Sequence, residues 1–165
     1  MPAENRPELD DADDAFWQFS LAFYARPGIA SACLALQDAH GRDVNLALYC
    51  CWLGASGRGR LDTAGLAKAE AAIAPWRSEV IEKLRGARRA IKAAGAAHAS
   101  LYAALKAVEL QSEHAAQHRL AALAPPANPG AVGDSKTAVA NLELYIGTDL
   151  ARGVAAPLVA ALINR

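Results

Sequence analysis

Aromatic side chains are concentrated in the first third of this 165-residue chain. Seven of the ten Phe, Trp and Tyr residues fall between Phe16 and Trp52. Aromatic rings supply much of the area that a small domain can bury, so this stretch is expected to anchor the core. A chain of this length fits one domain that buries roughly two-thirds of the surface of its unfolded form.

Helical periodicity runs along the sequence, whereas the signals of β-strands are nearly absent. Long β-branched runs, apolar–polar alternation and Asn-Gly hairpin turns are missing. We therefore expect an all-α, single-domain array of about six to seven helices, packed orthogonally or up and down. The expected helical segments are 13–25, 27–40, 44–55, 63–75, 76–94, 97–123 and, as one or two helices, 135–165.

The first of these segments is apolar on two sides. One stripe is made of phenylalanines and the other is mixed: Phe16, Phe19 and Phe23, against Trp17, Leu21 and Tyr24. A helix that is apolar on two sides is expected to lie at the centre of the fold. Asp13 or Asp14 is expected to cap its N-terminus.

Three expectations concern the middle of the chain. Pro75 should kink or end the helix that precedes it, because proline cannot donate a backbone hydrogen bond. Segment 76–94 is the most clearly amphipathic, with apolar residues spaced by three or four: Trp76, Val80, Leu84, Ala87 and Ile91. The seam of the long helix over 97–123 is predicted to be Leu101, Leu105, Val108, Ser112 and Ala115.

Composition shifts suggest four parts of the chain. Residues 1–12 form an acidic leader, and residues 1–14 together hold six acids against one base, a net charge of −5. Residues 13–124 form a helical core, and 125–134 a Pro/Gly linker. Residues 135–165 form C-terminal helices, interrupted near Gly147 and Pro157, that we expect to pack on the core.

The charge balance and the cysteines bear on compartment and partners. Seventeen bases balance seventeen acids, which argues against binding to nucleic acid or an anionic membrane. No apolar run approaches the roughly 20 residues that span a bilayer, and the acidic N-terminus does not resemble a secretory signal. Cys33, Cys50 and Cys51 lie in apolar helical runs without CxxC spacing. We expect buried, reduced thiols in a soluble, cytoplasmic protein.

A polar cluster between two apolar runs contains Gln37, Asp38, Asp43 and Asn45. The structural interpretation is a turn, in which Gly41 ends one helix in a left-handed conformation and Asp43 caps the next. Asn45 would then lie in the first turn of an apolar helix and need a partner, which Gln37, Asp38 or Arg42 could provide. The order of a calcium-binding loop is absent.

Four bases form a row on one side of segment 76–94. Arg85, Arg88, Arg89 and Lys92 stand at i, i+3, i+4 and i+7. We call them the basic row. The functional interpretation is a site for an acidic protein partner or a small anion, because guanidinium groups favour oxyanions. The alternative is a solvated face in which Arg88 pairs with a carboxylate of the next helix, such as Glu109.

The chain contains no complete metal-binding or cofactor-binding motif. His114 and His118 share the spacing of a zinc-binding helix, but alanine stands where HExxH has its general base. Glu109 and Glu113 lack the repeated Glu-x-x-His of a di-iron bundle. Phosphate loops, GxGxxG and a Ser-His-Asp order are also missing, so no metal, cofactor or catalytic residue is predicted.

The segment FWQFSLAFYARPGIASACLALQDAHGRDVNLALYCCWLG, followed by Trp76, LRGARRAIK and VELQSE, resembles a family of uncharacterised proteobacterial proteins. The resemblance runs from about Phe16 to Leu123, and LQDxxGxDVNL with the distal Arg88-Arg89 pair is its most specific part. It implies a bacterial, cytosolic, single-domain protein. The family carries no established activity, so it adds no catalytic residue.

These observations favour a non-enzymatic, cytosolic adaptor that binds a protein partner through its basic row. The alternative is a small-ligand-binding protein or enzyme with an aromatic pocket beside the turn over 37–45, lined by Trp17, Tyr24, Tyr49 and Trp52. A cavity of several hundred Å³ with converging polar groups would support the alternative. The identity of the partner and the oligomeric state stay open.

Overall fold

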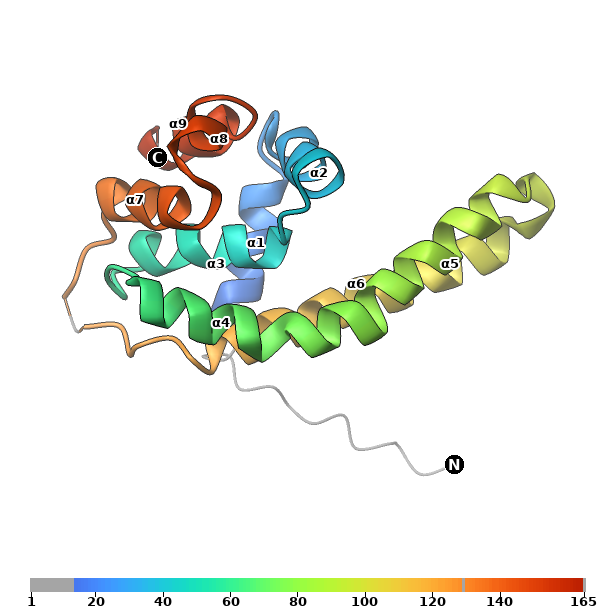
Figure 1. The fold of residues 1–165 in the computed structure, drawn as a ribbon, viewed down its shortest axis with the longest axis horizontal. Helices are drawn as coiled ribbons and strands as arrows, with labels where there is room; N and C mark the ends of the chain where they lie inside the picture. Colours follow the sequence, from blue (N-terminus) through green and yellow to red (C-terminus); the bar gives the residue numbers. More distant parts are fainter. Residues whose placement is uncertain (1–13, 129, 165) are drawn as a thin grey trace.

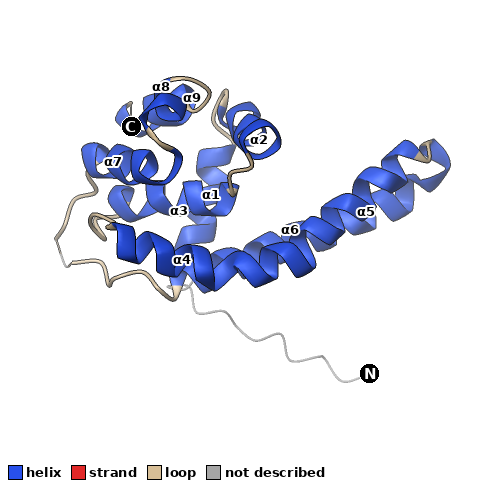
Figure 2. Cartoon of the chain, in the orientation of Figure 1, coloured by secondary structure: helices blue, strands red, loops and turns tan. Residues whose placement is uncertain are grey.

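The computed structural model describes residues 14–128 and 130–164, and within these ranges the chain is helical without a β-strand (Figure 1, Figure 2). This confirms the predicted all-α class. The elements are α1 (Ala15–Tyr24), α2 (Ile29–His40), α3 (Val44–Ala55), α4 (Thr63–Trp76), η1 (Arg77–Ile81), α5 (Glu82–Ala93), η2 (Ala96–His98), α6 (Ala99–Ala121), α7 (Ser135–Ile146), α8 (Thr148–Arg152) and α9 (Ala156–Ile163). The predicted acidic leader and Asp13 lie outside the described residues.

Helix α3 is the centre of the core. Every residue from Asn45 to Ala55 is buried, as expected for a helix that is apolar on nearly all sides. Its most extensive packing is against α7, and Gly54 makes the close approach possible. A Cβ atom at this position would lie 2.2 Å from the backbone nitrogen of Ala138. The α3–α7 crossing therefore requires glycine at position 54.

Helix α1 buries one face rather than the predicted two. Leu21 and Tyr24 are 44% and 36% exposed, so the prediction that α1 is central is wrong. Asp14 occupies the N-cap position, but its side chain makes no capping hydrogen bond and instead accepts one from Gln18. The buried residues of α1 are Phe16, Ser20 and Phe23.

Pro75 neither ends nor breaks the helix that contains it, and we call the continuous run of α4, η1 and α5 the rod. Helix α4 runs through Pro75 to Trp76 and continues through the π-helical turn η1 into α5. A π turn holds one residue more than an α turn, so it rotates the residues that follow. Ile81, the last residue of η1, is consequently buried, whereas the predicted Val80 is only partly covered.

Helices α5 and α6 form an antiparallel hairpin that projects from the helical body (Figure 1). We call residues 82–111 the arm, and no side chain in this range is buried. The predicted seam of α6 is partly wrong, because Leu101 and Val108 are 53% and 46% exposed. Leu105 and Ser112 are covered as predicted, whereas the other covered positions are each one residue further along: Tyr102, Glu109 and Ala116.

The C-terminal helices complete the body. Asp134 caps α7, and α7 packs on α3 while α9 packs on α2 and α7. The described residues of the predicted linker over 125–134 are not helical. Breaks occur at Gly147 and just before Pro157, as predicted. Leu142, Leu158 and Leu162 are fully buried and belong to the common core.

The sequence predicts buried, reduced thiols. The three cysteines are buried and none forms a disulfide, and burial raises the pKa of Cys33 and of Cys50 to about 12.

In the described part of the chain no single helix has both the length and the apolarity to cross a bilayer. Helices α1 and α2 reach that threshold when taken as a pair, but they are bent by 101°.

Candidate functional site

The turn between α2 and α3 has the predicted conformation. Gly41 is left-handed, with φ 61°, and its N–H donates to Gln37 O over 3.2 Å. The Asp43 carboxylate caps α3 by accepting hydrogen bonds from the backbone N–H groups of Asn45 and Leu46, at 2.8 and 3.2 Å. Both local predictions are confirmed.

Asp43 is buried, and groups from distant segments surround it. Its backbone N–H donates to the Tyr145 hydroxyl on α7 over 2.7 Å, and Arg77 Nε lies 3.6 Å from its carboxylate. Burial raises the pKa of Asp43 above its ordinary value, and the capping N–H groups and Arg77 partly offset that rise. The residue thus joins the α2–α3 turn to α7 and to the rod of α4 and α5.

Asn45 finds its partners on α6 and not in its own turn. Its side-chain amide donates to the Glu113 carboxylate, and its carbonyl oxygen accepts from Gln117 Nε2 over 3.0 Å. The expectation that Gln37, Asp38 or Arg42 would satisfy it is therefore wrong. Asp38 is exposed and accepts a hydrogen bond from Gln37.

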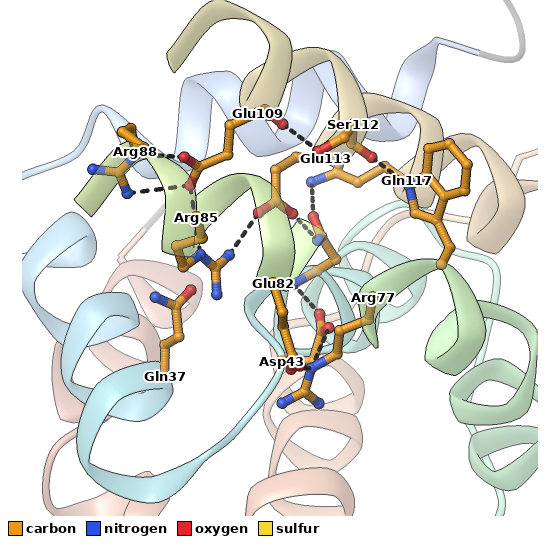
Figure 3. A network of polar contacts seen from close by, with 12 residues as sticks. Gln37, Asp43, Arg77, Glu82, Arg85, Arg88, Glu109, Ser112, Glu113 and Gln117 are labelled. Atoms are coloured by element: carbon orange, nitrogen blue, oxygen red, sulfur yellow. Dashed lines mark hydrogen bonds and ion pairs between the residues drawn. The ribbon is translucent and has the colours of Figure 1, made fainter. Parts of the chain in front are cut away.

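Two members of the basic row are paired with carboxylates of α6 (Figure 3). Arg85 donates to Glu113 over 2.7 Å and lies 3.5 Å from Glu109, while Arg88 donates to Glu109 through two nitrogens. Burial raises the pKa of Glu113, partly opposed by the hydrogen bond from Asn45 and by Arg85. The predicted Arg88–Glu109 pair is confirmed, and Arg85 is paired in the same way.

The other half of the row differs. Arg89 and Lys92 are exposed, and neither forms a salt bridge with a described residue. Arg89 and Lys92 lie on the same side of α5 as Arg85. The ion pairs of Arg85 and Arg88 with α6 therefore also fix the direction in which Arg89 and Lys92 point. Within the basic row, these two bases are therefore exposed and have no ion-pair partner among the described residues.

The π turn brings Arg77 into this network. Its Nε donates to Glu82 over 3.0 Å and one terminal nitrogen donates to Gly41 O over 3.4 Å. Sequence reasoning missed Arg77, and it also missed Gln117 and Tyr145. The nearest available signal was Pro75, because a proline inside a continuing helix requires a local change of helical geometry.

A cavity of about 20 Å³ lies inside the network. It has space for about one water molecule. The enclosed polar site therefore does not accommodate a substrate in this conformation. Its walls are Gln37, Arg42, Asp43, Val44, Asn45, Arg77, Ile81, Arg85 and Glu113.

The aromatic residues of the alternative interpretation lie in different surroundings. Tyr49 and Trp52 are buried beside Phe16, and Trp17 stacks on His114 with ring centroids 4.5 Å apart. Tyr24 is exposed. A larger open groove, of about 340 Å³, includes only Trp52 of the four predicted residues, and its walls are Phe19, Ala22, Phe23, Arg26, Trp52, Ala55 and Ser56.

His114 contacts the start of α1. Its Nε2 lies 2.8 Å from the Asp14 carboxylate, which ties the start of α1 to α6. Within the described ranges, no three His, Cys, Asp or Glu side chains are grouped so that they could hold a metal ion.

The fold and the site define a small all-α protein in which a buried polar network joins a helical body to a projecting hairpin. Residues 15–120 match a family described as "Protein of unknown function (DUF2390)", and the chain belongs to that family. The matched range agrees with the expected Phe16–Leu123 and contains the turn and the whole arm. No curated protein and no solved structure matches the chain.

Proposed function

We propose that this protein is a non-enzymatic, cytoplasmic binding module whose arm docks an acidic segment of a protein partner. The observation that carries the proposal is the division of the basic row. Arg85 and Arg88 hold the hairpin together, whereas Arg89 and Lys92 are exposed on an arm that contains no buried side chain. The proteobacterial origin implied by the LQDxxGxDVNL resemblance belongs to the same proposal.

Electrostatics supports an acidic partner. The arm holds six bases against two acids, a net charge of +4 in a chain that is neutral overall. Glu79 and Glu113, just outside the arm, pair with Lys83 and Arg85 and neutralise two of these bases. Such a local field speeds the encounter with an acidic surface, although charge at an exposed rim contributes more to association rate than to affinity. Arg89 adds a planar guanidinium that can bind a carboxylate through two hydrogen bonds.

The alternative of a small-ligand-binding protein or enzyme has less support. Gln37, Asp43, Asn45 and Arg85 do converge on one cavity, but that cavity holds about one water molecule. Asn45 and Arg85 there are both engaged with Glu113 on α6. A binding module is therefore the better-supported function.

The test is charge reversal on the arm, compared with the same change on the body. Arg89→Glu with Lys92→Glu should abolish capture of the partner from a host lysate, measured by quantitative mass spectrometry. The matched control is Lys68→Glu with Arg152→Glu, because these bases are also exposed and unpaired among the described residues. The control should retain the partner, and both variants should melt like the wild type. An arm variant that retains every partner bound by the wild type would contradict the proposal.

A further inference from the structure

Three exposed bases without an ion-pair partner among the described residues lie on one face of the arm: Arg89, Lys92 and Lys106. We call them the arm bases. Arg89 and Lys92 are four and seven residues beyond Arg85 and share its side of α5. Lys106 is seven residues before Glu113 and shares that residue's side of α6. Because Arg85 and Glu113 are paired across the hairpin, the two sides form one face.

The first described residue lies at the inner end of this face. A carboxylate oxygen of Asp14 is 2.8 Å from His114 Nε2 on α6. His114, Leu110 and Lys106 follow one another at four-residue spacing, which places them in one row along the helix. The eight residue steps from His114 to Lys106 correspond to about 12 Å. The segment that precedes Asp14 is therefore attached at one end of a row that leads to the arm bases.

Residues 1–13 are the electrostatic complement of the arm bases. They hold five acidic side chains against one basic side chain: Glu4, Glu8, Asp10, Asp11 and Asp13, against Arg6. The paired bases of the arm already have carboxylate partners, so the three arm bases are the part of its charge that is left to bind another acid. Opposite charge on two surfaces promotes their association and fixes their relative position.

The partly buried arginines of the body offer weaker sites for an acidic segment. The guanidinium groups of Arg58 and Arg119 stack on Trp52 and Trp76, with the guanidinium carbon 4.5 and 4.0 Å from the ring centroid. Each of the two arginines also donates to a backbone carbonyl oxygen. These groups are already engaged within the body, whereas the arm bases are open to solvent.

The length of the segment is sufficient. Asp10 is four residues before Asp14, so an extended chain carries it about 14 Å, the distance from His114 to Lys106. All thirteen residues extend to about 43 Å, whereas the start of α6 at Ala99 lies only about 22 Å beyond His114. Exposed ion pairs are individually weak. A short tether gives the segment an effective concentration in the millimolar range, at which several weak pairs together suffice.

We propose that residues 1–13 fold back along α6 and bind the arm bases of the same chain. The contact is electrostatic and exposed, so it weakens as the salt concentration rises. Arg89 and Lys92 are also the residues that the proposed function assigns to an acidic partner, so the segment and the partner compete for them. The competition rests on the proposed function, whereas the contact within the chain does not.

Paramagnetic broadening in the full-length protein tests the contact. A nitroxide attached to Ala3→Cys is selective, because the three native cysteines are buried. At low salt, the backbone amide signals of residues 86–107 should lose more intensity than those of α7. At about 1 M salt, where the Debye length is about 3 Å, the intensity should return. Undiminished arm signals at low salt, or a loss that persists at high salt, would overturn the proposal.

Charge reversal tests which bases hold the segment. Arg89→Glu with Lys106→Glu should restore the arm signals at low salt, because the new carboxylates repel the segment. Lys68→Glu with Arg152→Glu makes the same change at exposed positions of the body and should leave the broadening as in the wild type. An arm variant that keeps the wild-type broadening would overturn the assignment to these bases.

A mixture of chains tests whether the contact is intramolecular. Nitroxide-bearing chains are mixed with isotope-labelled chains that carry no nitroxide, and the arm signals should stay sharp. Broadening in this mixture would place the segment on a second copy and overturn the intramolecular contact.

Capture from a host lysate tests the competition separately. Asp10→Asn with Asp11→Asn should reduce the broadening and increase the amount of captured partner, because the competing segment is weakened. Equal capture by this variant and the wild type would overturn the competition. Failure of every chain to capture a partner would contradict the proposed function, while the spectra of the chain alone still decide the contact.

Discussion

Asp43 and Asn45 show what the polar residues at the start of an apolar helix do in this protein. The Asp43 carboxylate accepts hydrogen bonds from the first N–H groups of α3. The Asn45 side chain donates a hydrogen bond to Glu113 and accepts one from Gln117, both on α6. A buried amide or carboxylate without such partners would be costly. The cluster that stands out in the sequence therefore fastens the arm to the body.

Removal of the cap should destabilise the protein. Asp43→Ala is expected to lower the free energy of unfolding by about 2 kcal/mol, because two capping hydrogen bonds are lost at a buried site. Urea denaturation measures the loss. Asp38→Ala, an exposed carboxylate of the same turn, should unfold near the wild-type midpoint. An unchanged midpoint for Asp43→Ala would exclude the capping role.

Glu113 should leave a signature in the pH dependence of stability. Burial raises its folded-state pKa above 4.5, so between 4.5 and the raised value the folded protein binds more protons than the unfolded chain. The contribution of Glu113 to stability is then fully present below this window and is lost as pH rises through the folded pKa. Glu113→Gln should remove this part of the slope in urea unfolding measured across pH. An identical slope in both proteins would show that Glu113 titrates normally.

At the scale of elements, helix α3 and its caps could be predicted because the signals are local. Asp43 and Gly41 bond backbone groups within four residues of themselves. A helix that is apolar on nearly all sides is expected to be buried in the core. The partners of Asn45 could not be predicted, since they lie 68 and 72 residues away. The seam of α6 could be predicted only in part, because that helix has apolar residues on more than one side.

The hairpin should depend on Arg88 and not on its neighbour. Arg88→Glu places a carboxylate against the largely buried Glu109 and should cost about 2 kcal/mol, less than a fully buried pair because both side chains are partly exposed. Arg89→Glu makes the same charge change one residue along, at an exposed position, and should be nearly neutral. Thermal unfolding of the two variants compares them. Equal stabilities would mean that the Arg88–Glu109 pair does not hold the hairpin.

Two glycines should respond in opposite directions to the same substitution. Gly54→Ala should cost about 3 kcal/mol or more, because the new Cβ would overlap the backbone of α7. Gly86→Ala, in the exposed part of α5 with no atom within 4 Å of the new Cβ, should add roughly 1 kcal/mol through helix propensity. Chemical denaturation gives both signs. A tolerated Gly54→Ala would contradict the close α3–α7 crossing.

As a whole, the molecule divides into a body that holds every buried residue described and an arm that holds none. The body supplies stability, and the buried network sets the direction of the arm.

The most direct test of this division is to excise the arm. Residues 86–107 would be replaced by a short glycine-serine turn, which leaves Arg85, Glu109 and Glu113 in place. The shortened chain should still unfold cooperatively in urea, because no buried side chain has been removed. It should capture no partner from a host lysate that the full chain captures. A folded, shortened chain that retains the same partners would show that the body, and not the arm, is the binding surface.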